Sequence, residues 1–302
     1  MGRVPRSDAA GDFARSVRTP WAPSGGTRSR WAYVVALTLF AGVLAFSLEQ
    51  LRSVSIHWPW LVLTAAGAVA TLLLNGLEME LTARLTGRSL GVARSLRVAL
   101  LASAANLLPL PGGVVVRMRA LTEDGSRAAT AAWAAGTIAA TWFAVSCAGA
   151  GLVLLGSDGS WPGVSFLALA TILAVGTAWV GRRRLAAGWG LLGVGCVLEA
   201  VFVLVSAVRI LAVLRGLGLE AGWTEGIVLA VASAAASAVG VFPAGLGLRE
   251  ALTGALGYFV AVGPAAAALA AVVDRIVGVG TLAVGSVLLF GLSGGRKGRL
   301  RR

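Results

Sequence analysis

The sequence predicts an all-α polytopic membrane protein of six to eight transmembrane helices, built as an inverted repeat with two re-entrant segments broken by Pro and Gly. Three observations lead to this fold class. Of the 302 residues, 57% are hydrophobic and 13% are charged, whereas soluble domains are about 45–50% apolar and about 25% charged. Several apolar runs are long enough to cross a bilayer as helices. Two further apolar stretches, each interrupted by Pro and Gly, occupy matching places in the two halves of the chain.

Six uninterrupted apolar runs are predicted to cross the membrane, at 31–48, 59–81, 128–155, 163–181, 191–214 and 265–291. They define a transmembrane domain over residues 31–291. Residues 1–30 contain six Arg and little that can be buried, so we expect a disordered basic tail. Residues 292–302 form a second basic tail.

Basic residues concentrate on the cytoplasmic side of membrane proteins. Because both tails are rich in Arg, we expect both termini in the cytoplasm of a multi-pass protein of the cell membrane. The connections between spans alternate between Arg-rich and Arg-poor. From this alternation we expect 98–116 to enter and leave the membrane on the cytoplasmic side. Segment 226–248 is expected to start from the outside. In the alternative, both segments cross fully, which gives eight spans and the same placement of the termini.

The two halves, 31–155 and 163–291, repeat the same order of elements, with residue 31 corresponding to residue 163. In this alignment Pro111 corresponds to Pro243. Each half contains three spans, which is an odd number, so the second half is expected to run inverted relative to the first. Inverted repeats are a common plan of secondary transporters, whose sites lie where broken helices meet near the middle of the bilayer.

The broken stretches suggest a binding site for an anion. We expect Pro109–Gly113 and Pro243–Gly247 to be non-helical and buried, because irregular backbone is tolerated in the membrane only inside protein or beside water. A helix that restarts after such a break directs free N–H groups toward it, and these favour a negative charge. Arg117 and Arg249 each follow a break, and Arg suits a phosphate through its planar fork. We expect both to face one central cavity.

At these residues the chain resembles the lysylphosphatidylglycerol synthase transmembrane-region family, also called the flippase-like domain. The resemblance rests on N-x-L-P-x-P-G-G followed by Arg (Asn106 to Arg117), on F-P-A-G-L-G-L-R-E (Phe242 to Glu250), and on the pair Asp274-Arg275. It covers roughly residues 31–291. Members resemble translocases that pass modified or isoprenoid-linked lipids between leaflets, or membrane modules fused to lipid-modifying synthases.

Together, the breaks and the resemblance indicate a set of substrate-binding residues. They are Asn106, Pro111, Gly112, Gly113, Arg117, Pro243, Gly245, Gly247, Arg249, Glu250, Asp274 and Arg275. Two departures from the family pattern matter. The helix after the first hairpin reads AAWAAGTIAATWF and lacks the charged pair that members often carry there. The chain ends at residue 302 without a soluble aminoacyl-transferase domain, so we do not expect it to synthesise an aminoacyl lipid alone.

The expected function is a lipid flippase or translocase that handles a phosphate-bearing lipid, either a phospholipid or a polyprenyl-linked one. The alternative is a non-transporting membrane subunit that binds lipid or a partner lipid-modifying enzyme. We expect no enzyme activity, metal or other cofactor, because the sequence has one His and two Cys and no visible nucleophile–base pair or nucleotide loop. The net charge of +13 suits anionic lipid head groups, and no nucleic-acid motif accompanies it.

Other polar residues fall within the spans. Glu78 and Glu80 lie near the end of the second span, where we expect them to be solvated. Glu199 and Arg209 lie deeper, and charges at that depth cost about 2.5–3.5 kcal/mol on insertion scales, which favours a functional role. Adjacent helical residues point about 100° apart, so Asp274 and Arg275 should find partners on other helices. The two cysteines, Cys147 and Cys196, are expected to be small buried hydrophobes.

Overall fold

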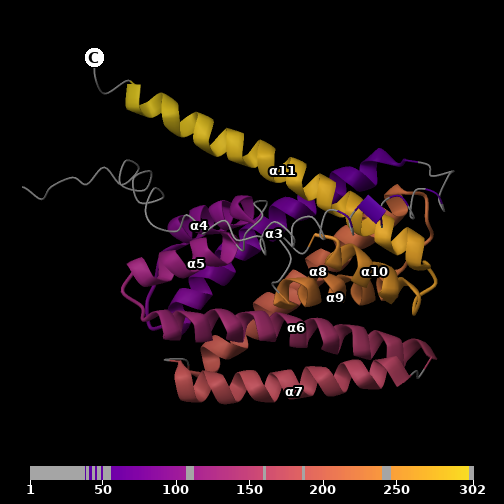
Figure 1. The fold of residues 1–302 in the computed structure, drawn as a ribbon, viewed down its shortest axis with the longest axis horizontal. Coiled ribbons are helices and arrows are strands. Elements are labelled where there is room, and N and C mark those ends of the chain that lie inside the picture. The colour runs from indigo at the N-terminus through magenta and orange to yellow at the C-terminus, as the bar shows by residue number, and fades with distance from the viewer. Residues whose placement is uncertain are drawn as a thin grey trace, which may run out of the picture.

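The computed structural model describes residues 56–106, 112–158, 161–185, 188–239 and 246–298, with a few isolated positions between 38 and 49. Across these ranges the regular elements are all α-helices (Figure 1). In chain order they are α3 (Trp58–Leu85), α4 (Val92–Ala105), α5 (Gly112–Glu123), α6 (Ala128–Asp158), α7 (Trp161–Arg184), α8 (Trp189–Gly216), α9 (Trp223–Val239), α10 (Leu248–Gly257) and α11 (Pro264–Gly298).

Five of these helices are long and apolar enough to cross a membrane, namely α3, α6, α7, α8 and α11. They match five of the six predicted spans and fit a multi-pass membrane protein. The first predicted span, 31–48, lies outside the described residues apart from isolated positions. The helix ends follow from local chemistry: α3 starts beside Pro59, whose fixed φ suits a first turn, and α11 starts at Pro264 after Gly263 at φ 80°.

Most residues of the two Pro/Gly stretches lie between described helices. The first falls between the end of α4 at Ala105 and the start of α5 at Gly112. The second falls between the end of α9 at Val239 and the start of α10 at Leu248. The predicted break to Gly113 is too long by two residues, because Gly112 and Gly113 already form the first turn of α5. Residues 107–111 and 240–245, which include three of the predicted site residues (Pro111, Pro243 and Gly245), lie outside the described residues.

Small residues let the long helices approach closely. Helices α6 and α7 run antiparallel along one side of the molecule (Figure 1). At their contact, a Cβ on Gly151 would lie 2.9 Å from the carbonyl oxygen of Gly163. Glycine at such crossings is typical of helix packing in lipid. There the hydrophobic effect does not drive helices together, and close van der Waals packing of the backbones does so instead.

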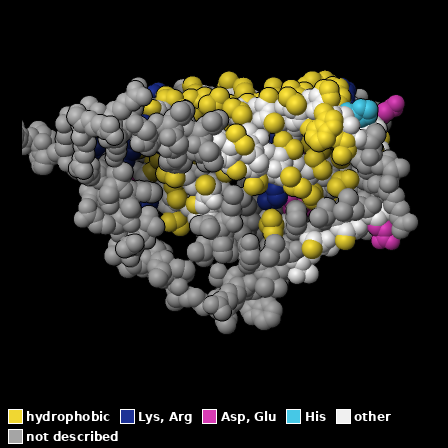
Figure 2. All heavy atoms as spheres, turned by 90° about the horizontal axis from the view of Figure 1, so that it is seen from above, with side chains coloured by type: hydrophobic (Ala, Val, Ile, Leu, Met, Phe, Trp, Pro, Cys, Tyr) yellow, Lys and Arg dark blue, Asp and Glu magenta, His cyan; other side chains and the backbone are white. Residues whose placement is uncertain are grey.

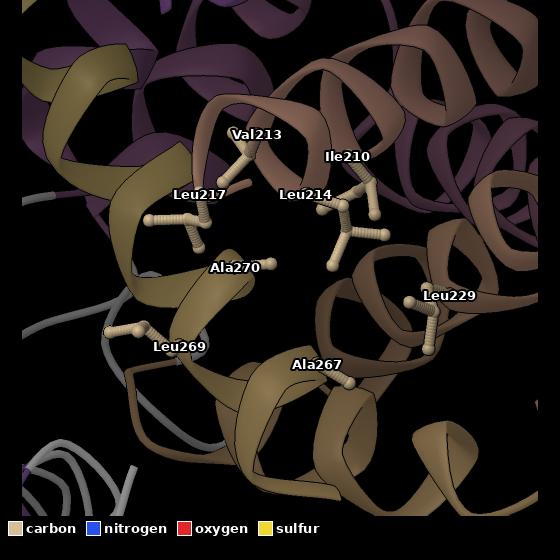
Figure 3. Close-up of a cluster of buried hydrophobic side chains, with 8 residues drawn as sticks. All are labelled: Ile210, Val213, Leu214, Leu217, Leu229, Ala267, Leu269 and Ala270. Carbon is tan, nitrogen blue, oxygen red and sulfur yellow. The ribbon is translucent and has the colours of Figure 1, made fainter. Parts of the chain in front are cut away.

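One buried apolar cluster joins α8, α9 and α11. Ile210, Val213 and Leu214 of α8 meet Leu229 of α9 and Ala270 of α11 (Figure 3). All five are at most 1% exposed. Outside such clusters, hydrophobic side chains dominate the described part of the face drawn in Figure 2. This outward-facing apolar surface is what a bilayer requires.

The bounds of the helices repeat along the chain. Helices α3 and α8 both have 28 residues, and α8 begins at residue 189 against residue 58 for α3. In each half, a long helix is followed by two shorter ones and then by another long one: α3, α4, α5, α6 and then α8, α9, α10, α11. In the predicted repeat α7 corresponds to the span 31–48, which lies outside the described residues apart from isolated positions. The repeat therefore stays a prediction, to which this order of helices lends support.

Candidate functional site

The first break is held together by an asparagine and a glycine pair. Asn106 lies just after α4, and its Oδ1 accepts a hydrogen bond of 2.9 Å from the backbone N–H of Gly113. That N–H is one of the first four of α5, which have no partner within the helix. A Cβ on Gly113 would overlap the Asn106 side chain, and one on Gly112 would overlap the carbonyl of Ala105. Two glycines are therefore needed for α5 to begin this close to the end of α4.

The second break ends at a glycine and a buried glutamate. Gly247 precedes α10 with φ 78°, a backbone conformation that side chains other than Gly rarely adopt. Its N–H donates to Oε2 of Glu250 at 2.8 Å. Glu250 is fully buried, and its other oxygen accepts a 2.6 Å hydrogen bond from Nε of Arg275 on α11. Glu250 thus fixes the start of α10 and ties it to the last helix.

Asp274 is the centre of a second set of ion pairs. It is fully buried on α11. Its Oδ2 accepts from Nη2 of Arg249 at 2.6 Å, and its Oδ1 lies 2.8 Å from Nη2 of Arg209 on α8. Arg249 does not pair with its neighbour Glu250, which the sequence alone left open. The prediction that Asp274 and Arg275 have partners on other helices is confirmed.

Arg117 takes part in a third set of polar contacts. Its Nη1 donates to Oε1 of Glu78 at 2.9 Å, and its Nη2 donates to Oδ1 of Asn75 at 2.8 Å. The Glu78 side chain is only 15% exposed, so the expectation that it is solvated is wrong. Glu199 of α8 lies within electrostatic range of Glu78 and Arg117. It is 1% exposed, and its Oε1 has no hydrogen-bond partner among the described residues.

One face of α3 connects the ion pairs of Asp274 with those of Arg117. Thr71, Asn75 and Glu78 are spaced four and three residues apart, so they share a face of the helix. Arg209 donates to Oγ1 of Thr71 at 3.0 Å, while Arg117 bonds both Asn75 and Glu78. We call the whole set the charged cluster; it comprises Thr71, Asn75, Glu78, Arg117, Glu199, Arg209, Arg249, Glu250, Asp274 and Arg275.

Five members of the charged cluster were not among the predicted site residues, namely Thr71, Asn75, Glu78, Glu199 and Arg209. Thr71 and Asn75 lie in an apolar span, and their polarity, at helical spacing from Glu78, was the available signal. Glu199 and Arg209 were recognised as costly charges but were not assigned to the site.

Glu80 was expected to be solvated, but its side chain is buried and has a structural role. It is 4% exposed. Its carboxylate accepts hydrogen bonds from the Arg84 and Ser89 side chains and from the backbone N–H groups of Leu90 and Gly91. It thereby shapes the turn between α3 and α4.

The geometry was compared with metal-ligand arrangements among the described residues and with known proteins. Among the described residues, no group of three or more His, Cys, Asp or Glu side chains is placed to hold a metal ion. No protein-family model, curated protein or solved structure matches the chain. The charged cluster must therefore be interpreted from its own chemistry.

Proposed function

We propose that this protein is a lipid translocase of the cell membrane that handles a phosphate-bearing lipid, with the charged cluster as its head-group site. The observation that carries the proposal is the environment of Arg249. Its Nε is buried and has no hydrogen-bond partner among the described residues, although the same guanidinium pairs with Asp274. A buried donor without a partner costs about 1–3 kcal/mol. An anion at this position would satisfy it.

The charge balance around Arg249 favours the same ligand. Two guanidinium groups, those of Arg209 and Arg249, share the single carboxylate of Asp274. This sharing leaves local positive charge beside Asp274, inside the membrane domain. A phosphate offers a compensating charge and oxygen atoms for parallel hydrogen bonds from Arg. The first N–H groups of α10, which have no acceptor within the helix, also favour an anion at this position.

Movement of the lipid is supported by the broken helices. Helices α5 and α10 each restart after a Pro/Gly stretch, and each carries one arginine of the charged cluster, Arg117 or Arg249. We propose that the two broken stretches are re-entrant and that the halves form an inverted repeat, with both termini cytoplasmic. Such an arrangement would let one site open alternately to either side. The repeated order of helices supports this reading.

A non-transporting subunit is the second candidate. It would use the charged cluster to bind a lipid, or to dock a partner lipid-modifying enzyme, without moving anything across the bilayer. The fixed ion pairs of Asp274 and Glu250 favour it, since three helices are tied together there. Co-purified lipid without transport would identify this function.

The deciding experiment is reconstitution into liposomes with a fluorescent phospholipid or polyprenyl-phosphate analogue. A reagent outside the liposome reports how fast the lipid changes leaflet. We expect wild-type protein to accelerate the movement and Arg249→Ala to abolish most of it. Arg119→Ala is the matched control, because Arg119 lies on α5 at the surface and pairs with Glu123. Equal rates with and without protein, for every lipid with a phosphate, would remove transport from the proposal.

A further inference from the structure

A groove lies on the outer side of the helix bundle, away from the charged cluster. It is formed by α6, α7 and α8 and has a volume of about 480 Å³. Small side chains leave it hollow, including Ala144 and Ala148 of α6, Ala170 and Ala174 of α7, and Gly193 and Cys196 of α8. Its walls are mostly apolar.

The groove opens toward the surface that the bilayer covers. Ala174, Gly193 and Cys196 are all exposed, so the prediction that both cysteines are buried holds for Cys147 and is wrong for Cys196. Along α7 the lining runs from Leu167 to Ala178, which is roughly 16 Å at 1.5 Å per residue. An elongated apolar groove on the surface that faces the bilayer suits a hydrocarbon chain.

Three consecutive arginines stand at the end of α7. Each lies over a tryptophan ring: Arg182 over Trp189, Arg183 over Trp179 and Arg184 over Trp133, at 5.5, 4.9 and 5.8 Å from the ring centres. The chain has no acidic residue between Asp158 and Glu199. No ion pair joins these arginines to a carboxylate in the part of the chain that the structure describes. They form a positive surface held in place by aromatic stacking.

Trp189 joins the arginines to the groove. It lines the groove, and its ring also lies under Arg182. Thr177 and Ala178, which line the same end, lie one turn before Arg182 on α7. A molecule whose hydrocarbon chain fills the groove therefore brings its polar end to the arginines. Tryptophan and arginine at this level are typical of the membrane–water interface.

We propose that this groove is a binding site for an anionic phospholipid. One acyl chain lies between α6, α7 and α8, and the phosphate lies against Arg182 and Arg183. The site is separate from the charged cluster, and it does not depend on whether the protein moves lipids. Charge selects the ligand: a zwitterionic phospholipid has the same chains but a neutralised head group, so it gains less from the arginines.

Photo-crosslinking in nanodiscs tests this site. The probes are phosphatidylglycerol and phosphatidylcholine that carry the same diazirine acyl chain, each at low mole fraction in unlabelled phosphatidylcholine. Crosslinked peptides are mapped by mass spectrometry. We expect the phosphatidylglycerol probe to label the groove segments of α7 and α8 more strongly than the phosphatidylcholine probe does. Removal of each arginine should cut this preference about fivefold, which corresponds to about 1 kcal/mol per basic residue near an anionic lipid.

Two pairs of variants separate head group from chain. Arg182→Gln with Arg183→Gln should abolish the preference, whereas Arg215→Gln, which removes an arginine stacked on Trp60 elsewhere, should keep it. Ala174→Leu should fill the groove and lower labelling by both probes. Its control is Val175→Leu, an exposed position beside it that does not line the groove.

The proposal fails if the two probes label the groove equally. It also fails if the preference survives loss of both arginines, or if labelling avoids the groove altogether because another protein chain covers it.

Discussion

Asp274 on α11 accepts hydrogen bonds from two arginines that reach it from different helices, Arg249 of α10 at 2.6 Å and Arg209 of α8. Its side chain is 1% exposed, while those of the two arginines are 19% and 11% exposed. One carboxylate thus stabilises two positive charges within a low-dielectric interior. Loss of this carboxylate would leave both guanidinium groups without their shared ion-pair partner.

Replacement of Asp274 by Asn should destabilise the protein strongly. Removal of one partner from a buried ion pair costs about 3–5 kcal/mol, because the remaining charge stays buried without compensation. The measurement is thermal unfolding of the purified protein in detergent. Glu123→Gln is the control, since that pair lies at the surface and surface pairs contribute about 0–1 kcal/mol. The double change Asp274→Asn with Arg249→Met should recover part of the loss; no recovery would show that the two residues are not coupled.

Replacement of Arg249 by Lys should slow lipid movement without unfolding the protein. Lysine keeps the positive charge, but it lacks the planar fork that holds a phosphate with two parallel hydrogen bonds. In the liposome assay, Arg249→Lys should lie between the wild type and Arg249→Ala. Membrane abundance of each variant is the control. A lysine variant as fast as the wild type would mean that charge alone is used.

Arg117→Ala should impair movement from the opposite leaflet. Arg117 belongs to α5 in the first half, and the proposed inversion places its break on the other side of the membrane from that of α10. The prediction is checked by loading the fluorescent lipid into one leaflet at a time. Equal effects of Arg117→Ala and Arg249→Ala on both directions would argue against two separate entrances.

Gly113→Ala should disrupt the first break. A Cβ at this position would overlap the side-chain amide of Asn106, which caps α5. We expect lower thermal stability and loss of lipid movement. Gly136→Ala in α6 is the matched control, because its Cβ would meet nothing within 4 Å, and Ala in a helix is more favourable than Gly by about 1 kcal/mol. Similar behaviour of the two variants would show that the close approach at Gly113 is not required.

Glu80→Gln should destabilise the turn between α3 and α4. The carboxylate of Glu80 accepts only, and it receives hydrogen bonds from Arg84, Ser89 and two backbone N–H groups. An amide would place its own donors against some of these donors, and hydrogen bonds to a charged group contribute about 1.5–3 kcal/mol each. The expected loss in unfolding temperature is therefore larger than for Glu123→Gln. Unchanged lipid movement at low temperature would distinguish this structural role from one in transport.

The sequence by itself determined the class of fold and the places where helices stop. Long apolar runs must become helices in a bilayer, because only then are all backbone N–H and C=O groups paired within the segment. Pro and Gly interrupt helices through their own backbone restrictions, so the end of α4 and the start of α10 were predictable to within a few residues. Helix geometry alone also predicted that the side chains of Asp274 and Arg275 point in different directions.

The tertiary structure decided which charges meet. The partners of Arg117, Arg249 and Arg209 lie 39, 25 and 65 residues away in sequence, and no local pattern specifies such pairs. It also decided that Glu80 is buried under the α3–α4 turn and that Cys196 faces outward into a groove. Local backbone preferences act over a few residues, whereas ion pairs and burial depend on how whole helices pack. For that reason the position of each charge was visible in the sequence, but its partner was not.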